Sequence, residues 1–583
     1  MGYDARARAA AVKDDPAAAA VIERYAPGVL DSPVLSSLTT IRLGALVGGG
    51  LFVGEKPRGL DQMWAELADL DGSDPEPEPQ PAPGPPADGY EGEEVPRASA
   101  RIETPQEARV HERVELVLHG PDHGNPFIDV ELTAHLTLGD RQVRVGGFYD
   151  GGGIYRLRWL PDLEGQWHLR TSSNARSLDG VELDLEVVAA PVGIRGPVRV
   201  ADDFHFAHAD GTRFHPFGTT LYAWWHQPED VRRRTLASLA RTSFTKARVC
   251  VFPKSFLFNR EEPEVMPYVR SEDGTWDLAT FDPEFFRRLE RGVEQLAAVG
   301  VQTDLILFHA YDRWGFSEMP AWADEHYVRY VVRRLAAHES VWWSLANEYD
   351  LVRAKTTEDW ERIAQVIGEE DHADHLTSIH NCYEHYDHTR PWITHASVQR
   401  VDAYRTAEDT DDMRERWGKP VVFDECGYEG DLEHGWGNIT GQELVRRAWE
   451  GALRGGYVNH GETYLNETEE LWWSKGGELV GSSPERFAFL RSVIAELPGG
   501  RLDPVTSNWD APWAAAGDVL VTYLGFAQPR YRTIIRPPGT RYTVDIIDTW
   551  AMTVERLPRE FEGAFRVELP GRQWMALRLT PIP

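Results

Sequence analysis

The amino-acid sequence predicts a multidomain α/β protein: a (β/α)8 TIM barrel flanked by N-terminal and C-terminal β-sandwich domains, with an N-terminal helical segment. Residues 196–500 alternate short apolar runs with amphipathic helical patterns, which is typical of βα units. Residues 97–195 and 501–583 have a period of two instead, which is typical of half-buried strands. A Pro-rich acidic stretch at 71–96 separates these regions from residues 1–70.

The composition argues against several classes of function. The 583 residues include 61 Lys and Arg against 93 Asp and Glu, a formal net charge of −32. Such acidity disfavours binding to nucleic acid or to an anionic membrane surface. The sequence has no secretory signal, no run of about 18 apolar residues and only three widely spaced cysteines. We therefore expect a cytoplasmic protein with no nucleic-acid partner, no membrane partner and no cofactor.

The first 70 residues are predicted to form short helices. Asp15-Pro16 is a typical helix start, and two similar patterns follow it. The three apolar stripes contain Ala17, Val21 and Tyr25; Val34, Leu35, Leu38 and Ile41 after Ser32-Pro33; and Leu60, Met63, Trp64 and Leu67. Helices this short cannot form a core alone, so we expect them to pack on the rest of the chain or to mediate a homo-oligomer contact.

Residues 71–96 are predicted to be a linker. They contain eight prolines and eight acids but no Lys or Arg. A segment of this composition cannot bury apolar surface, and its prolines and like charges keep it extended.

Alternating apolar residues predict an Ig-like β-sandwich over 97–195 and a second β-sandwich over 501–583. In the first region the alternating sets are Val114, Leu116 and Leu118; Ile128, Val130 and Leu132; and Leu183, Leu185 and Val187. In the second region the predicted strands are 519–524, 542–547 and 575–579.

Residues 196–500 are predicted to be the catalytic barrel. Its eight strand-like runs end near Leu221, Phe252, Phe308, Ala346, His380, Ser397, Asp424 and Asn459. Helix starts are predicted at Asp282-Pro283, at the capping box of Thr440 and Glu443, and at Ser483-Pro484. The segment from Tyr383 to Arg390 has no helical pattern, so a loop is expected there.

Polar residues collect at the ends of these strands, where a barrel of this type holds its site. The candidates for substrate binding are Arg248, Asn347, His226, His309, His380, His395 and His460, with the tryptophans Trp224, Trp314 and Trp473. Indole rings stack on the C–H faces of sugars, whereas imidazoles and amides bind hydroxyls. The set therefore favours a carbohydrate substrate.

Glu348 and Glu425 are the predicted catalytic pair. Each follows an apolar strand, and three strands separate them, so they can face each other across the mouth. Two carboxylates about 5 Å apart let one attack an anomeric carbon while the other protonates the leaving oxygen, whereas a wider gap favours inversion. Asp424 and Glu462 are rivals. Adjacent strand residues face opposite ways, so Asp424 and Glu425 cannot both face the substrate.

Three motifs resemble those of a known family. Leu345-Ala346-Asn347-Glu348 and Phe423-Asp424-Glu425 resemble the Asn-Glu and Glu motifs of clan A retaining glycoside hydrolases, and the stretch 247–253 resembles that clan's strand-two Arg motif. The order of domains, with the stretch 207–218 at the start of the barrel, is similar to that of bacterial apiosidase-like enzymes. The resemblance covers about residues 100–500.

The resemblance implies a role for each matching residue. Glu348 would be the general acid/base and Glu425 the nucleophile. Asn347 would bind the sugar 2-hydroxyl, and Arg248 would keep Glu425 ionised, as a nearby guanidinium does. The clan often has a Tyr near strand six beside the nucleophile, and this sequence has His395 there instead.

The sequence thus predicts a retaining exo-glycosidase that acts on small glycosides or oligosaccharides. Two alternatives stay open. One is a catalytically silent carbohydrate-binding protein. The other is a metal-dependent hydrolase that uses the His-rich loop 371–388, although the spacing of its His, Asp and Cys residues matches no known motif and no metal site is predicted there.

Overall fold

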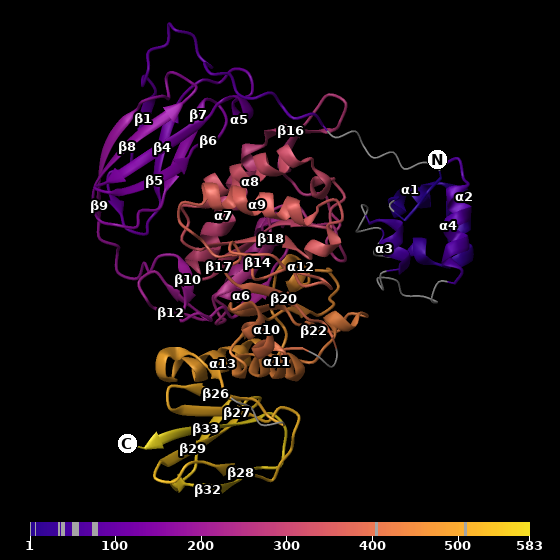
Figure 1. Cartoon of the computed structure of the whole chain (residues 1–583), viewed down its shortest axis with the longest axis vertical. Coiled ribbons are helices and arrows are strands. Elements are labelled where there is room, and N and C mark those ends of the chain that lie inside the picture. The colour runs from indigo at the N-terminus through magenta and orange to yellow at the C-terminus, as the bar shows by residue number, and fades with distance from the viewer. Residues whose placement is uncertain are drawn as a thin grey trace.

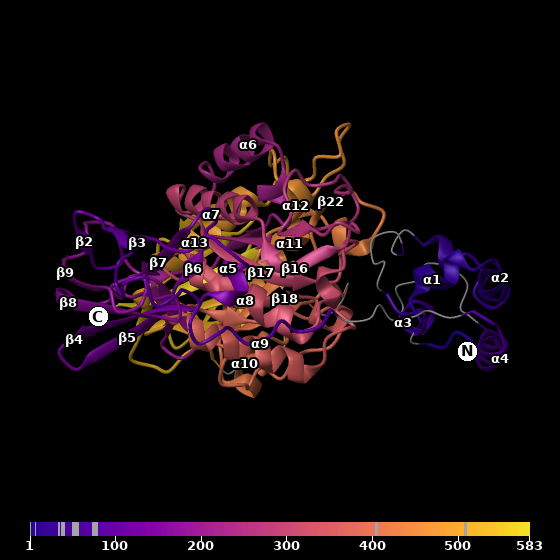
Figure 2. The ribbon, with the colours of Figure 1, turned by 90° about the horizontal axis from the view of Figure 1, so that it is seen from above.

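The structure, a computed structural model, is a multidomain α/β protein. It describes residues 2–5, 7–32, 35, 41–48, 58–72, 80–402, 406–505 and 510–582. Figures 1 and 2 both show a small group of N-terminal helices beside a large central part, and Figure 1 shows β-sheets at two other sides of that part.

The N-terminal group consists of four short helices. They are α1 (Ala9–Asp14), α2 (Pro16–Tyr25), α3 (Leu43–Gly48) and α4 (Leu60–Ala68). The carboxylate of Asp15 accepts hydrogen bonds from the N–H groups of Ala17 and Ala18, so the helix start predicted there is confirmed. Ile22 on α2 and Met63 on α4 are fully buried, so this chain alone covers their apolar faces. The helix predicted after Ser32 falls mostly on 33–40, outside the described residues except for 35.

Two sheets follow, which are antiparallel except for one parallel pair of strands at the edge of the second. The first has the order β1 (Arg101–Glu103), β3 (Val114–His119), β7 (Ile154–Trp159) and β6 (Phe148–Tyr149), and the second the order β2 (Ala108–Arg109), β9 (Glu182–Val188), β8 (Gly165–Ser173), β4 (Leu132–Leu138) and β5 (Arg141–Gly146). The strand predicted from the alternation of Ile128, Val130 and Leu132 is wrong. Asn125 caps the short helix α5 (Pro126–Asp129), and β4 begins only at Leu132.

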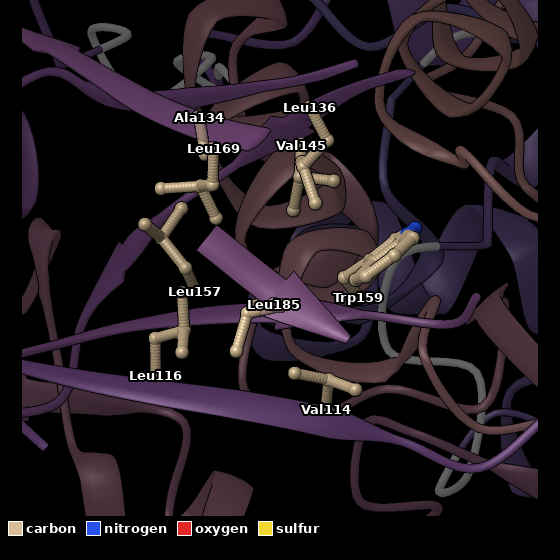
Figure 3. A pocket seen from close by; sticks show the side chains of 9 residues that line it. All are labelled: Val114, Leu116, Ala134, Leu136, Val145, Leu157, Trp159, Leu169 and Leu185. Carbon is tan, nitrogen blue, oxygen red and sulfur yellow. The ribbon is translucent and has the colours of Figure 1, made fainter. Parts of the chain in front are cut away.

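Apolar side chains of the two sheets point toward one another (Figure 3). The gap that remains among nine of them is about 10 Å³. A gap of this size, with apolar walls, is too small for a ligand and offers a water molecule no polar partner. This part of the chain therefore has a packed core and no binding cavity at that place.

Eight parallel strands follow one another in the central part. The first five are β13 (Gly218–Thr220), β14 (Lys246–Cys250), β17 (Gln302–His309), β18 (Val341–Asn347) and β19 (Thr377–Ser378), and the other three are β20 (Ala396–Gln399), β21 (Val421–Glu425) and β23 (Tyr457–Val458). Parallel bridges from His380 to Ser397 and from Thr219 to His460 join the two sheets at both edges. This ring order is consistent with the predicted (β/α)8 barrel.

Helices connect most of these strands. They are α6 (Glu229–Leu239), α7 (Pro283–Ala298), α8 (Ala321–Leu335), α9 (Thr357–Glu370), α10 (Thr410–Trp417), α11 (Gly441–Leu453) and α13 (Pro484–Ala495). Residues 379–395, all described, contain no helix, as predicted for the segment after the fifth strand. Asp282 caps α7 as predicted. At α11, Thr440 accepts from the N–H of Glu443, whereas the Glu443 carboxylate pairs with arginines, so only half of the predicted capping box forms.

Shorter elements complete the central part. A three-stranded antiparallel sheet of β10 (Val198–Ala201), β11 (His205–His208) and β12 (Arg213–Phe214) precedes the ring. The sequence did not indicate the hairpin of β15 (Tyr268–Arg270) and β16 (Trp276–Phe281), the parallel pair β22 (Glu429–Gly430) and β24 (Glu462–Thr463), or the short helix α12 (Trp472–Lys475).

The C-terminal region is built from strands. One sheet contains β25 (Asp503–Pro504), β26 (Trp513–Ala516), β27 (Val519–Tyr523), β33 (Met575–Ile582), β29 (Arg541–Asp548), β30 (Thr553–Arg556) and β31 (Phe561–Glu562), and a second contains β28 (Tyr531–Ile535) and β32 (Ala564–Glu568). Strands β27, β29 and β33 lie where the sequence predicted them. None of the helices in the described part of the chain is long and apolar enough to cross a membrane.

Candidate active site

Glu348 and Glu425 lie in one hydrogen-bond network at the C-terminal ends of β18 and β21. Asn347 connects them. Its Nδ2 donates to Glu348 at 3.3 Å, and its Oδ1 accepts from the Tyr222 hydroxyl at 3.2 Å and from Arg248 at 3.1 Å. Tyr222 and Arg248 also donate to Glu425. The structure therefore brings together the four residues on which the predicted chemistry rests.

The carboxylate of Glu425 has charged and polar partners on a single oxygen. Its Oε1 accepts from the Tyr222 hydroxyl and from Arg248 Nη1 at 3.2 Å, and it lies 3.4 Å from His380 Nε2. Burial raises the pKa of Glu425 to about 8. The guanidinium of Arg248 favours the anion and so acts against the effect of burial on this pKa. Burial also lowers the pKa of His380 well below its usual value, so this imidazole is neutral.

Glu348 is bound only by neutral donors. The Tyr311 hydroxyl and Asn347 donate to Oε2, and Gln399 Nε2 donates to Oε1 at 3.1 Å. Glu348 also has a φ of 53°, in the left-handed region that residues other than Gly rarely adopt. Backbone conformations of this kind are concentrated at functional sites, where the surrounding structure imposes them.

The rival carboxylate Asp424 is already fully engaged. Lys246 Nζ lies 2.5 Å from both Asp424 and Asp304, and Asn459 donates to Asp424 at 2.6 Å. Burial opposes ionisation of Asp424, but the Lys246 ammonium lowers its pKa below the usual range. Asp424 is therefore a fixed counter-ion beneath the site.

His395, a predicted substrate-binding residue at the place where the clan often has a Tyr, does not lie beside the carboxylates. His395 precedes β20, at the opposite end of the strand from the carboxylates, and its ring packs on Phe206 and Trp342. Gln399, the last residue of β20, reaches Glu348 instead. The tyrosine beside Glu425 is Tyr222, which follows the first strand of the ring. Gln399 therefore lies at the other end of the strand that His395 precedes, and Tyr222 follows a different strand.

The predicted tryptophans lie in three different places. Trp473 packs edge-to-face on Tyr222, with ring centroids 6.1 Å apart, and so borders the site. Trp224 is fully buried and donates to the carbonyl of Arg232, so it belongs to the core and not to the mouth. Trp314 is half-buried and donates to Glu262 at 3.0 Å, away from both carboxylates.

Three of the predicted histidines do not contact the catalytic pair. His226 stacks on Trp225, His309 bonds the carbonyl of Phe252, and His460 packs on Phe244. Burial lowers the pKa of both His226 and His309 to about 3, so neither carries charge. Of the predicted histidines, only His380 joins the network.

A cavity of about 380 Å³ lies beside the network. Its walls include His226, Lys254, Asn259, Arg288, Glu470 and Lys475. Lys254 connects this cavity to the site because its Nζ lies 3.5 Å from the ring centroid of Tyr222 and 4.3 Å from that of Tyr311. Burial lowers the pKa of Lys254 to about 8. No sequence motif indicates this lysine beyond its place after the second strand.

The His-rich loop does not form a metal site within the part of the chain that the structure describes. Asp371 pairs with His375, and His372 accepts from the N–H of Leu160. The rings of His385 and His388 pack on Trp417. The three-ligand group found among the described residues lies elsewhere, at Glu429, His460 and Glu462.

A carboxylate pair at the ends of parallel strands, with an amide between the carboxylates and an aromatic ring beside them, is compatible with glycoside hydrolysis. Comparison with known proteins agrees. Among solved structures, a candidate glycoside hydrolase from Bacteroides vulgatus ATCC 8482 is 34% identical, with a TM-score of 0.78, and the match covers 82% of this chain and 100% of that one. The family described as "Apiosidase-like, catalytic domain" matches residues 201–511, more than half of the chain. The protein belongs to this apiosidase-like family of glycoside hydrolases.

Other comparisons concern the fold and the flanking regions. A glycoside hydrolase family 5 structure from the same Bacteroides strain has a similar fold, with 14% identity, a TM-score of 0.53 and coverage of 66% of this chain and 94% of that one. Two domains of unknown function, DUF5060 and DUF5605, match residues 107–174 and 509–580. No curated protein matches the chain.

Proposed function

We propose that the protein is a retaining exo-glycosidase in which Glu425 is the nucleophile and Glu348 the general acid/base. The observation that carries this proposal is the difference between the two carboxylates. Glu425 has a guanidinium at 3.2 Å, whereas Glu348 has only hydroxyl and amide donors. A cation favours the anion that attacks, and neutral partners suit a group that must gain and lose a proton.

The chemistry follows in two balanced steps. The Glu425 carboxylate attacks the anomeric carbon, the glycosidic bond breaks, and the proton of Glu348 moves to the leaving oxygen. A water molecule then gives its proton to Glu348, and its oxygen displaces Glu425 from the anomeric carbon. Because the Tyr311 hydroxyl can donate or accept, it can stay bonded to Glu348 in both of its protonation states.

Asn347 is suited to bind a hydroxyl of the sugar that is cleaved. Its amide lies between the two carboxylates and touches Glu348, Tyr222 and Arg248. A hydroxyl placed there would receive hydrogen bonds that strengthen as charge develops at the anomeric carbon.

The burial of the pair supports action at a chain end. Glu348 is 5% exposed and Glu425 is 7% exposed. Carboxylates as little exposed as these suit one terminal sugar better than the interior of a long polysaccharide. Small glycosides or oligosaccharides are therefore the proposed substrates.

The same proposal gives each of the other regions of the chain a fold. The ring at 196–500 would be a (β/α)8 barrel, supported by its closed parallel strand order. Residues 97–195 would be an Ig-like β-sandwich and 501–583 a second β-sandwich, each supported by two mainly antiparallel sheets and its own apolar core. Residues 1–70 would be a helical segment, and 71–96 a linker.

Substitution of each carboxylate separates the two roles. Glu425→Ala should lower kcat by about 10⁴-fold or more on every substrate. Glu348→Ala should retain hydrolysis of aryl glycosides with good leaving groups, and azide should rescue it because this anion attacks the glycosyl-enzyme without help from a general base. Asp424→Asn is the matched control for a carboxylate on the same strand that does not touch the substrate.

The stereochemistry of the product tests retention directly. Hydrolysis of an aryl glycoside followed by NMR should show the starting anomeric configuration in the first sugar released. Inverted product, or azide rescue of Glu425→Ala instead of Glu348→Ala, would contradict the assignment. Activity that survives both substitutions would exclude this pair as the catalytic machinery.

A further inference from the structure

A second buried carboxylate pair lies outside the catalytic network. Glu429 on β22 and Glu462 on β24 are each 1% exposed, and His460 is fully buried beside them. One ligand atom from each of the three side chains lies within 4.8 Å of the other two. None of the three contacts Glu348 or Glu425, so the proposed reaction leaves this group without a role.

The two carboxylates have neutral hydrogen-bond donors only. Glu429 Oε1 accepts from the N–H and hydroxyl of Ser482 and from the Tyr464 hydroxyl, and its Oε2 accepts from the N–H of Ser483. The Glu462 oxygens accept from the N–H groups of Val480 and Gly481, both at 2.8 Å.

No Lys or Arg of the described residues forms an ion pair with either of these carboxylates. Two buried negative charges that share one site repel each other strongly unless a cation or a proton compensates them.

His460, the third member of the group, has one nitrogen without a hydrogen-bond partner. Its Nδ1 lies 3.0 Å from the Thr219 hydroxyl, which fixes the ring together with the stacking on Phe244. Its Nε2 has no hydrogen-bond partner although the residue is fully buried. A buried nitrogen without a partner is costly, and a metal ion is one way to satisfy it.

Gly481 indicates where the carboxylates converge. A Cβ at this position would lie 2.5 Å from Glu462 Oε2 and 2.7 Å from Glu429 Oε2. The two oxygens therefore face the same small volume, which only a glycine leaves open. Each of them carries a single backbone N–H donor, so each retains an electron pair for a cation.

We infer that Glu429, His460 and Glu462 form a binding site for a divalent transition-metal ion, Zn²⁺ or Mn²⁺. Two carboxylate oxygens and one imidazole nitrogen supply three ligands, and water would supply the rest. The imidazole disfavours Ca²⁺ and Mg²⁺, which take oxygen ligands almost exclusively. The bound cation would neutralise the pair and engage the unpaired nitrogen.

The site would tie together three segments around the mouth of the ring. Glu429 lies four residues after Glu425, Glu462 follows the eighth strand, and residues 480–483 lead into α13. The ion would therefore hold the segment after the proposed nucleophile in place and act on the reaction only through position. This inference is independent of the proposed function, because a metal at this site requires no glycosidase chemistry.

Metal binding to the full-length protein tests the inference. After dialysis against a chelator, titration with Zn²⁺ or Mn²⁺ alone should restore about one ion per chain and raise the melting temperature. Gly481→Ala and His460→Ala should each weaken binding by about tenfold or more, measured by metal analysis and by the Mn²⁺ electron paramagnetic resonance signal.

His388→Ala is the matched control, since it removes a buried histidine with unpaired nitrogens from the loop 371–388 and should leave the metal content unchanged. Absence of stoichiometric binding to the chelated wild type would overturn the inference, and this result does not depend on the folding of any variant. Undiminished binding by His460→Ala, or stoichiometric Ca²⁺ binding without Zn²⁺ or Mn²⁺ binding, would also overturn it.

Discussion

The two buried carboxylate pairs of this protein differ in what surrounds them. Around Glu348 and Glu425 the donors are side chains, including the guanidinium of Arg248. Around Glu429 and Glu462 the donors are mostly backbone N–H groups of residues 480–483, and no arginine or lysine of the described residues is paired with them.

This difference in donors suits the first pair to a reaction and the second pair to holding segments of the chain in place. Side-chain donors can shift as a carboxylate gains or loses a proton, and a cation on one member alone makes the two members chemically unequal. Backbone donors hold both members of the second pair in one geometry. Burial alone therefore does not indicate whether a carboxylate is catalytic or structural, whereas the identity of its hydrogen-bond donors does.

Removal of the Arg248 guanidinium should cause the largest loss of activity at the Glu348–Glu425 pair. Arg248→Met should lower kcat/KM by about 10²–10³-fold, because it removes a charged donor that acts on both Glu425 and Asn347. It should also raise the pKa of Glu425 further. Arg248→Lys keeps the charge but loses the two-donor geometry, so an intermediate loss is expected. Equal activity of Arg248→Lys and the wild type would contradict this role of the guanidinium.

The pH profile should reveal the raised pKa of the nucleophile. Glu425 must be ionised to attack, and burial raises its pKa to about 8. With aryl glycosides whose leaving groups need no proton from Glu348, we therefore expect kcat/KM to rise with pH and to level off above about 8, with a loss of about tenfold for each pH unit below that value. A plateau that extends to pH 5 would show that Arg248 and Tyr222 outweigh desolvation.

The two tyrosines should affect different steps. Tyr222→Phe removes a donor to Glu425, whereas Tyr311→Phe removes a donor to Glu348. We expect losses of about tenfold for each, with Tyr311→Phe more harmful for poor leaving groups, which need protonation. Rates for a series of aryl glycosides of different leaving-group pKa would measure this. The same dependence on leaving group in both variants would contradict the division of roles.

The free energy of unfolding should be more sensitive to substitution of Glu429 in the second pair than to substitution of Glu425 in the first pair. Glu429→Gln turns an acceptor oxygen into an amide N–H that faces backbone N–H groups, and it should lower the free energy of unfolding by about 1–3 kcal/mol. Glu425→Gln replaces a carboxyl whose charged form is costly to bury, so it should leave stability unchanged or raise it. Unfolding in urea would measure both, and equal destabilisation would remove the contrast.

The smallest effect is expected at His395. It lies at the opposite end of β20 from the carboxylates, so His395→Ala should change kcat/KM by no more than about twofold per folded molecule. Circular dichroism would establish the folded fraction. A large loss of activity in fully folded protein would mean that this histidine acts on the site after all.

Much of the architecture and the proposed catalytic pair could be predicted because local patterns decide them. Apolar runs that end in Asn347-Glu348 and in Asp424-Glu425 mark strand ends, and parallel strands bring such ends to one rim. The alternation at Ile128 and Val130 failed because Asn125-Pro126 starts a helical turn there. Period two is a weak signal over so few residues when a capping residue precedes it.

The partners of the carboxylates could not be predicted in the same way. Tyr222, Tyr311 and Gln399 come from three different strands, and none lies in a motif of its own. Placing them requires the boundary of each strand to within one residue, and boundaries are the least certain part of a pattern. His395 and Trp224 were misplaced for the same reason.

The sequence by itself determined the α/β class, the order of regions and the positions of Glu348 and Glu425, because hydrophobic periodicity and strand ends are local properties. Only the tertiary structure decided which donors each carboxylate meets and how far burial raises the pKa of Glu425. It alone also brought Glu429, His460 and Glu462 together. These properties depend on distances between segments far apart in the chain, and electrostatic energies follow those distances.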